Sequence, residues 1–414
     1  MEKHLRVLLL ALLFSANLLF SQELVKIATY NVLNYPDNSF TRNPYFALIM
    51  DEIDPDILVV QEIKSQTGVN QFRSNVLGSK YNAGTFVDGP DDDRAIFYKD
   101  SLFTFVSNNP IKTSLRDINE FTVVHNFTQD TLRLYGLHLK ASSGSDNEQR
   151  RLDEVTALRS VTDQLSDGVY FIVLGDFNVY SSFEPAYIKL LDNSTPGYVI
   201  DPINKPGGWN NNSAFAEVHT QSTRTDNIGD GGSTGGLDDR FDQILISESI
   251  YQPGGVDYVS GTYTSFGNDG NHFNGSINDG TNTAVGSEVA NALYIASDHL
   301  PVYAVFDFGI STGVDDPENS ELNFELSQNY PNPFNPSTKI SYSLSENSNV
   351  IIKIYDILGK QIVELVNEIK LAGTYTTEWN ASDYSSGIYF YSIEASSISS
   401  GKYFSNTKKM MLVK

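Results

Sequence analysis

Residues 170–178 read Tyr-Phe-Ile-Val-Leu-Gly-Asp-Phe-Asn. The first five are apolar and rich in β-branched and aromatic types, which is typical of a buried β-strand. Gly175 ends the run, and Asp176 and Asn178 then place a carboxylate and an amide at the end of the strand. A turn in which these two side chains hydrogen-bond the local backbone also explains the pattern. This stretch alone therefore leaves both interpretations open.

Polar groups of the same kind stand at the ends of other apolar runs. They are Tyr30-Asn31 after 24–29, Gln61-Glu62 after 57–60, His138 after 131–137 and Ser297-Asp298-His299 before 302–308. Each group taken singly is more often a solvated turn or a satisfied core residue. Together they predict a rigid cup of carboxylates, amides and imidazoles, because catalytic groups are commonly held at strand ends and adjoining loops.

Strand and helix patterns alternate through the first 309 residues. Strands are predicted at 24–30, 57–61, 95–98, 121–127, 131–139, 170–174, 241–246 and 302–308, and helices at 45–53, 68–77 and 147–165. This mixture favours two sheets packed together with helices outside, a layered α/β sandwich. Residues 204–239 and 261–291 are rich in Gly, Asn, Asp, Ser and Thr, and loops of this length are either functional or mobile. Residues 229–236 also fit a flexible tether.

The ordered set of motifs resembles the endonuclease/exonuclease/phosphatase family across residues 24–308. The motifs are Thr29-Tyr30-Asn31-Val32, Gln61-Glu62, Gly175-Asp176-Phe177-Asn178, Arg240-Phe241-Asp242 and Ser297-Asp298-His299. The family includes pancreatic-type deoxyribonucleases, abasic-site endonucleases, inositol-phosphate phosphatases and neutral sphingomyelinases. The resemblance implies its fold, a two-sheet α/β sandwich with outer helices, and metal-dependent hydrolysis of phosphate esters.

The resemblance also implies a metal site. Glu62 is expected to be the main metal carboxylate, with Asn31 beside it and Asp298 completing or orienting the shell. Hard oxygen ligands suit Mg²⁺ first, with Mn²⁺ or Ca²⁺ as alternatives, rather than Zn²⁺.

The remaining motif residues are expected to act on water and phosphate. Asp176 would hold and deprotonate the attacking water, and Asn178 would hydrogen-bond the phosphate as charge develops. His299 would contact phosphate oxygens opposite the metal, with Asp242 fixing its tautomer. The implied chemistry is in-line displacement by water on a metal-polarised ester, without a phosphoenzyme.

His138 resembles a second histidine of the deoxyribonuclease-like and sphingomyelinase-like members, which can assist the leaving oxygen. Abasic-site enzymes place a tyrosine in this part of the site. Tyr135 precedes His138 by three residues, so strand alternation predicts that it lies on the opposite face.

Basic residues near these motifs have two interpretations each. Arg150 and Arg151, after Lys140, resemble a pattern of bacterial extracellular nucleases, which makes Arg151 a candidate substrate-binding residue; a solvated helix start is the alternative. Arg94 matches a family position that could touch substrate phosphate. The adjacent acidic run 91–93 makes a local ion cluster equally plausible.

The first residues predict a signal peptide, residues 1–21. A basic start with Lys3 and Arg6 precedes the apolar run 7–20, which is shorter than a bilayer-spanning helix requires. No other segment is long and apolar enough to predict a stable membrane span. The chain has no Cys, which excludes thiol catalysis and thiolate metal sites.

A linker at 310–321 separates the predicted catalytic domain, residues 22–309, from residues 322–414. This last region contains only strand and turn signals and predicts a small all-β sandwich of about seven strands. Its motifs at 328–344, 350–360 and 387–391 resemble the C-terminal sorting domain of the type IX secretion system of Bacteroidetes-like bacteria. The resemblance implies a secreted or cell-surface protein that engages the secretion machinery. A sugar-binding or adhesive sandwich is the alternative.

The whole chain has a net charge of −23, and residues 22–321 carry −24 of it, because residues 322–414 contain eight lysines and eight acidic residues and residues 1–21 have a net charge of +1. Such a domain gains nothing from general attraction to nucleic acid, although bound divalent cations can invert the local field. The leading hypothesis is an extracellular nuclease. A lipid or inositol-phosphate phosphodiesterase or phosphatase ranks second, and a non-catalytic surface-binding protein is the alternative of another class. The oligomeric state is not predicted.

Overall fold

The computed structural model describes residues 23–36, 41–91, 93–252, 254–309, 325–344, 347–357, 360–370, 373–397 and 403–414. The chain forms two compact units, divided between Thr312 and Gly313. The predicted signal peptide and the predicted linker at 310–321 lie outside the described residues. Within the described ranges, no helix has the length and apolar character needed to cross a membrane.

The first unit contains two mixed β-sheets. One has the order β11 (Val256–Tyr258), β13 (Val302–Phe308), β1 (Leu24–Tyr35), β2 (Ile57–Ile63), β4 (Asp93–Lys99), β3 (Tyr81–Ala83), with β12 (Thr264–Ser265) also paired to β13. The other has the order β5 (Phe103–Ile111), β6 (Ile118–His125), β7 (Thr131–His138), β8 (Tyr170–Asp176), β10 (Asp242–Ser247), β9 (Val199–Ile200). The pairs β1–β2 and β7–β8 are parallel, so each brings two carboxyl ends to one edge.

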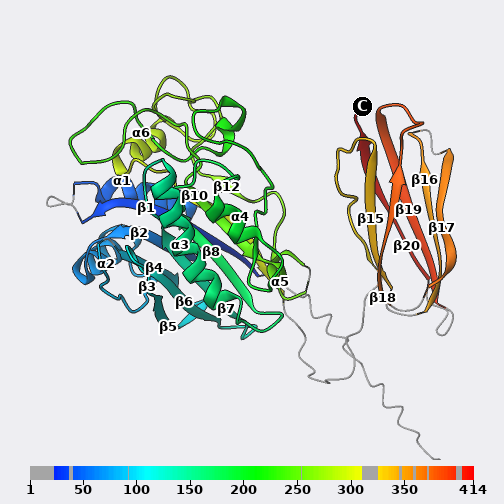
Figure 1. Cartoon of the computed structure of the whole chain (residues 1–414), viewed down its shortest axis with the longest axis horizontal. Helices are drawn as coiled ribbons and strands as arrows, with labels where there is room; N and C mark the ends of the chain where they lie inside the picture. The colour runs from blue at the N-terminus through cyan, green and yellow to red at the C-terminus, as the bar shows by residue number, and fades with distance from the viewer. Residues whose placement is uncertain are drawn as a thin grey trace, which may run out of the picture. The chain divides into compact units, whose positions relative to one another are not determined.

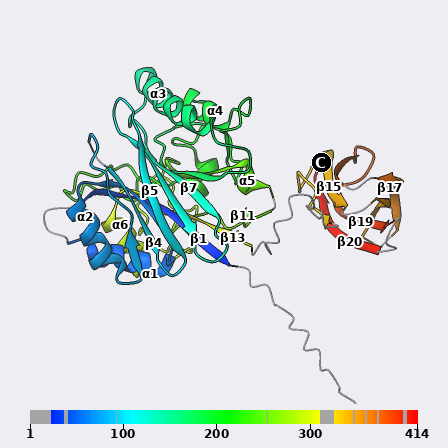
Figure 2. The same ribbon diagram turned by 90° about the horizontal axis from the view of Figure 1, so that it is seen from below.

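Strand alternation fixes the layers of this unit. Alternate residues such as Ile27 and Val59 from one sheet and Leu134 and Ile172 from the other form a shared core between the sheets. The opposite face of the first sheet is covered by α1 (Asn43–Ile53), α2 (Gln66–Phe72) and α6 (Ser287–Ala296). The opposite face of the second sheet is covered by α3 (Ser145–Thr162) and α4 (Pro185–Leu191). Figures 1 and 2 show the sheets between these two groups of helices, which confirms the predicted α/β sandwich with outer helices.

Three local features differ from the sequence prediction. The predicted helix 68–77 is α2 followed by a π-helical turn, Arg73–Leu77. The predicted loop 261–291 is wrong at its end, because α6 begins at Ser287 and buries Val289 and Leu293 at helical spacing. Strand β5 was not predicted, because it is a half-exposed edge strand with little apolar alternation.

The second unit is all-β in its described residues. Three strands form one sheet in the order β14 (Glu325–Leu326), β15 (Ser337–Leu344), β18 (Gly373–Asn380). Four form another in the order β17 (Gln361–Lys370), β16 (Ser348–Tyr355), β19 (Gly387–Ser397), β20 (Tyr403–Leu412). Both sheets contribute to one core around Trp379 and Tyr391. The predicted small β-sandwich is confirmed.

Candidate active site

A polar cleft of about 270 Å³ lies where β1, β2, β7 and β8 end. Its lining residues come from strand ends and from the loops that connect them: Leu33, Asn34, Glu62, His138, Ala141, Ser142, Asp176, Asn178, Tyr180, Gln221, Gly231, Ser233, Phe241, Asp298 and His299. The pairing registers explain the gathering, because His138 lies directly opposite Asp176 and Asn31 opposite Gln61 in the two parallel pairs. The structure thus brings the predicted motif residues to one place.

An irregularity in the β2–β4 ladder turns Glu62 into the cleft. The β2–β4 register shifts between Gln61 and Ile63, so Glu62 bulges out with φ of 61°. Bulges and left-handed backbone at non-glycine residues gather beside active sites. Gln61 meanwhile stays buried and donates to Thr29 Oγ1 at 2.9 Å. The bulge, and not simple strand alternation, therefore sets the direction of the Glu62 side chain.

Amides hold the Glu62 carboxylate on both sides. Asn31 Nδ2 donates to Glu62 Oε1 at 3.0 Å, and the backbone N–H of Asn34 donates to Glu62 Oε2 at 2.9 Å. The Asn31 Oδ1 atom accepts from Leu33 N at 3.0 Å. Asn31 therefore orients the carboxylate rather than presenting its own oxygen in this arrangement.

Asp176 stands at the centre of the cleft floor and is almost fully buried. Its Oδ1 accepts the backbone N–H of Asn178 at 3.0 Å. Its Oδ2 lies 3.2 Å from Asn31 Nδ2, 3.4 Å from His138 Nε2 and 3.7 Å from His299 Nε2. One oxygen is fixed by the turn, and the other faces the two imidazoles.

Gly175 makes the close approach of β8 to β7 possible. A Cβ at this position, where φ is 139°, would overlap the carbonyl oxygen of Leu137. Asn178 follows with φ of 50° and donates through Nδ2 to Leu139 O at 3.2 Å. The turn interpretation of residues 175–178 is thus confirmed, and the same turn leaves Asp176 and Asn178 lining the cleft.

His299 is held by a carboxylate behind it. Its Nδ1 lies 2.7 Å from Asp242 Oδ2, which leaves Nε2 facing Asp176 and, at 2.5 Å, Gln221 Nε2. Burial lowers the pKa of His299, but the carboxylates of Asp242, Asp176 and Asp298 outweigh it and raise that pKa well above its ordinary value. Burial raises the pKa of Asp242 to about 6, against the opposing effect of His299.

Asp298 carries the observation that bears on a metal. It is 3% exposed, and its Oδ2 accepts from Ser233 N at 2.6 Å and from Gln221 Nε2 at 3.3 Å. Its Oδ1 is buried without a hydrogen-bond partner, and a buried carboxylate oxygen of that kind is costly unless paired. Together with Glu62 it offers hard oxygen donors to the same cleft, and such donors suit Mg²⁺, Mn²⁺ or Ca²⁺. These donors are of the type that suits the expected cation, and among the described residues no group of three or more His, Cys, Asp or Glu side chains is placed to hold a metal ion by itself.

Arg94 is not brought to the cleft. Its side chain is fully buried; it donates to Asn119 Oδ1 at 3.1 Å and also to the Asp117 carbonyl oxygen. In the alternation of β4 it shares the inward face with Ile96, so it lies between the sheets. The expected contact with substrate phosphate is therefore replaced by a contact that joins β4 to the second sheet.

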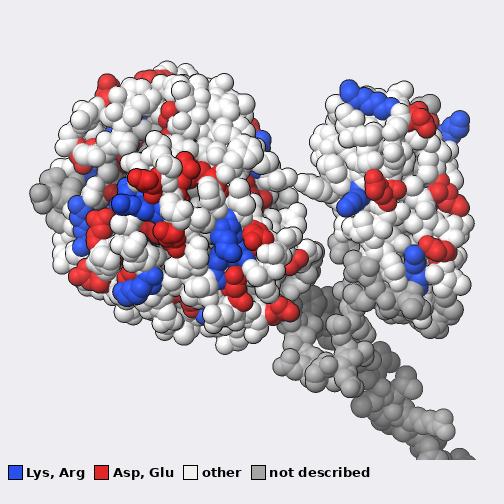
Figure 3. All heavy atoms as spheres, viewed as in Figure 1, with Lys and Arg blue, Asp and Glu red and all other residues white. Residues whose placement is uncertain are grey.

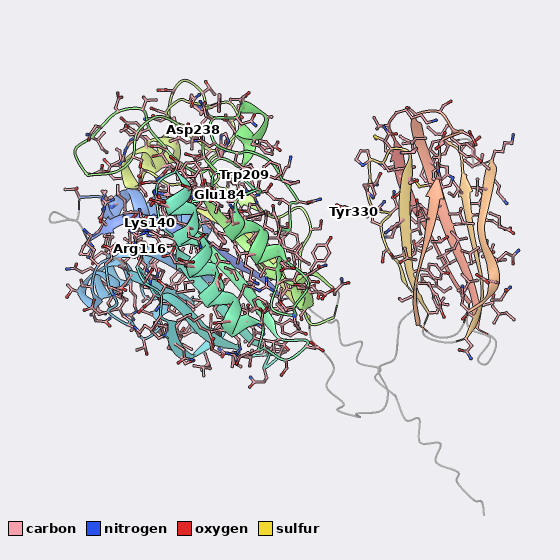
Figure 4. All side chains as sticks on the ribbon, in the orientation of Figure 1. Arg116, Lys140, Glu184, Trp209, Asp238 and Tyr330 are labelled. Carbon is pink, nitrogen blue, oxygen red and sulfur yellow. The ribbon has the colours of Figure 1, made fainter. Side chains whose placement is uncertain are left out.

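Arg151 also lies away from the cleft surface. It is fully buried and pairs with Glu184 Oε2 at 2.8 Å through Nε. Its Nη1 donates to the carbonyl oxygens of Lys140 and Ser142 at 2.8 and 2.9 Å; Lys140 and Glu184 are labelled in Figure 4. Arg151 thus fixes the loop that carries Ala141 and Ser142 into the cleft, and the neighbouring Arg150 is the exposed one.

Sequence reasoning missed several residues of the cleft. Gln221 bridges His299 and Asp298, although it lies about 80 positions away in a segment without a strand pattern. Tyr180 lines the cleft with its ring at 5.0 Å from that of Phe241. Gly231 and Ser233 come from the stretch expected to be a tether. Tyr135, as strand alternation predicts, faces the helix-covered side and donates to Glu120.

Charge around the cleft offers little general attraction for a polyanion. No Lys or Arg side chain is among the cleft-lining residues in the described part of the chain. On the face shown in Figure 3, acidic and basic side chains are interspersed on this unit.

Comparisons with known proteins agree with this geometry. Residues 28–299 match the Endonuclease/Exonuclease/phosphatase family, and residues 328–410 match the secretion system C-terminal sorting domain. The second match implies secretion or a cell-surface location. No curated protein sequence matches the chain.

Solved structures with a similar fold share little sequence. TDP2 from D. rerio, complexed with single strand DNA product, is 17% identical with a TM-score of 0.46, covering 68% of this chain and 98% of that one. An endonuclease/exonuclease/phosphatase family protein from Bacteroides thetaiotaomicron is 16% identical with a TM-score of 0.47, covering 70% and 100%. The mannosyl-6-phosphatase of the same species is 17% identical with a TM-score of 0.46, covering 68% and 99%.

Proposed function

We propose that this chain, which belongs to the Endonuclease/Exonuclease/phosphatase family, is a secreted phosphodiesterase that hydrolyses extracellular nucleic acid with the help of a divalent cation. Family membership makes it a hydrolase of phosphoric esters. The observation that supports the finer proposal is that His138 and His299 both face the Oδ2 atom of Asp176 in a polar cleft. A second imidazole beside the base can give a proton to the leaving oxygen of an ester, and the resemblance of His138 to the second histidine of the deoxyribonuclease-like members is what favours a phosphodiester.

Asp176 is proposed as the general base. Its Oδ1 is occupied by the Asn178 N–H, so the proton of a bound water would go to Oδ2. The two imidazoles and the Asn31 amide lie 3.2–3.7 Å from that oxygen, which lines the polar cleft where a substrate water would enter. This geometry orients the water without a covalent intermediate.

His299 is proposed to bind a phosphate oxygen through Nε2. Asp242 fixes the ring through Nδ1 at 2.7 Å, so the imidazole cannot turn away. A fixed donor aimed at developing charge stabilises a transition state more than a mobile one, because it needs no reorganisation. Asn178 is proposed as a second donor, since its amide nitrogen carries one hydrogen more than the contact to Leu139 uses.

Glu62 and Asp298, with Asn31 orienting the first of them, would hold the cation, for which Mg²⁺ is the first choice. When bound, a divalent cation would polarise the phosphoryl oxygen and neutralise negative charge in this acidic cleft. His138 lies 4.0 Å from Glu62 and 3.4 Å from Asp176, and it is proposed to assist the leaving oxygen.

A substrate panel tests this proposal. The purified protein is incubated with DNA, RNA, sphingomyelin and inositol phosphates under saturating Mg²⁺. Cleavage of DNA or RNA at the highest kcat/KM supports the proposal. Preference for the lipid or the inositol phosphates would replace it with the second family function. Binding without turnover on any substrate would indicate a non-catalytic surface protein.

Chelation is expected to abolish activity. Excess chelator should reduce hydrolysis of a generic phosphodiester to background, because the carboxylates of Glu62 and Asp298 then repel the phosphate they should help to bind. Added Mg²⁺, Mn²⁺ or Ca²⁺ should restore the rate. Turnover measured before chelation, after it and after each metal is added back provides the check. Undiminished turnover in chelator contradicts the metal requirement.

Deletion of residues 322–414 is expected to stop export and leave chemistry intact. The cleft-lining residues of the described chain all fall between Leu33 and His299, and residues 328–410 match a sorting domain. The truncated protein should accumulate in the cell envelope of the native host with kcat within about threefold of the full chain. Its distribution between envelope and medium is the measurement. Normal release of the truncated protein would refute the sorting assignment.

A further inference from the structure

The glycine-rich segment 229–236 is an ordered part of the cleft. Gly231 and Ser233 line it, and Ser222 Oγ donates to the Ser233 carbonyl at 2.8 Å. Gly232 has no space for a side chain, because a Cβ there would overlap Arg224 Nη2 and lie 2.8 Å from Leu33 Cδ2 and 3.1 Å from the Asp298 Cβ. At Gly232, therefore, close packing rather than flexibility accounts for the glycine.

An ion pair between Arg224 and Asp230 holds this segment. Arg224 is fully buried, and its Nη2 donates to both carboxylate oxygens of Asp230 at 2.8 and 2.7 Å. Its Nη1 donates to the Tyr294 carbonyl at 3.0 Å, which ties the pair to α6. The Arg224 carbonyl accepts the N–H groups of Gly235 and Gly236 at 3.1 Å each. Arg224 thus contacts both ends of the segment.

The segment in turn fixes one of the proposed metal carboxylates. The backbone N–H of Ser233 donates to Asp298 Oδ2 at 2.6 Å. The other oxygen, Oδ1, is buried without a hydrogen-bond partner, and Asp298 lines the cleft. Donors behind a ligating carboxylate set its direction, and losing such a contact typically weakens metal binding or activity about 10- to 100-fold.

We infer that Arg224 and Asp230 are positioning residues for the cation: their ion pair holds segment 229–236 closed, so that Ser233 N–H directs the free oxygen of Asp298 into the cleft. This inference rests on the proposed function, because it takes Asp298 as a metal ligand. It assigns the segment a task in metal affinity. A purely structural role for the ion pair would change the melting temperature alone.

The test compares two substitutions that remove the same charge from one loop. Asp230→Asn breaks the pair, whereas Asp226→Asn removes an exposed carboxylate for which no contact to Arg224 exists. Mg²⁺ affinity is measured by calorimetry on the full mature chain, well below the melting temperature, together with kcat and KM. We expect about tenfold weaker Mg²⁺ binding in D230N and less than about twofold change in D226N. Arg224→Lys should lie between them, because a lysine keeps the charge but has one nitrogen in place of the two that contact Asp230 and the Tyr294 carbonyl.

A double variant covers the case in which D230N fails to fold. Breaking one partner of a buried pair leaves an unpaired charge, whereas removing both charges is tolerated far better. Arg224→Gln with Asp230→Asn should therefore fold and still show the weakened Mg²⁺ affinity. Folded single and double variants that bind Mg²⁺ like the parent would overturn the inference. Failure of the parent itself to bind Mg²⁺ would instead overturn the proposed function on which the inference rests.

Discussion

Asp176→Asn should lower kcat by about 10²–10⁴ while leaving the fold intact, because loss of a general base costs that much. Asparagine keeps the shape of the side chain and an oxygen that can accept the Asn178 N–H. It cannot take a proton from water. The carboxylate lies at a strand end with its Oδ2 turned to the cleft, so little core packing changes.

The control for this variant is Asp167→Asn. Asp167 is exposed and lies just before the start of β8, whereas Asp176 is the last residue of that strand. kcat under saturating Mg²⁺ and thermal melts should be measured for both proteins. D167N is expected to match the parent in both. A folded D176N within about threefold of the parent kcat would show that the base lies elsewhere.

Strand ends were the part of the site that the sequence predicts well. A parallel pair such as β7–β8 must bring His138 and Asp176 together, since the register that buries Leu134 and Ile172 also fixes the two ends. The bulge that turns Glu62 was not predictable, because one residue of register shift depends on how β2 meets β4.

Arg94 and Arg151 occupy positions whose burial the sequence pattern indicates. Arg94 alternates with Ile96, so strand period two already places it inward. Arg151 shares the helical spacing of Val155 and Leu158, which marks the buried stripe of α3. Both patterns indicate burial, whereas the interpretations given for these arginines were a substrate contact, a local ion cluster at Arg94 and a solvated helix start at Arg151.

The loops could not be predicted because their contacts join distant segments. Gln221 contacts Asp298 and His299, although β10 and α6 lie between them in the sequence. A glycine-rich sequence looks the same whether its glycines make the backbone flexible or allow other groups to pack closely against it. At Gly232 the neighbours Arg224, Leu33 and Asp298 decide the matter, and they come from three separate parts of the chain.

His299→Ala should reduce kcat by about 10²–10³ and raise KM much less. Removing one fixed donor to developing charge in an active site has an effect of that size on kcat, and a contact that strengthens in the transition state appears in kcat rather than in KM. Asp242→Asn should act in the same direction with a smaller loss, because Nδ1 of His299 keeps a neighbour at 2.7 Å but loses its negative charge.

The combination of Asp176→Asn with His299→Ala distinguishes a shared transition state from two independent contributions. Asp176 Oδ2 and His299 Nε2 lie 3.7 Å apart and would act on the same water and phosphate, and groups that act as a unit lose less together than the product of their separate losses. Full kcat and KM values for the parent, both single variants and the double variant complete the cycle, with thermal melts for each. Losses that multiply would mean that the two residues serve different steps. Single variants that both stay within about threefold of the parent while folded would place the active site outside this cleft.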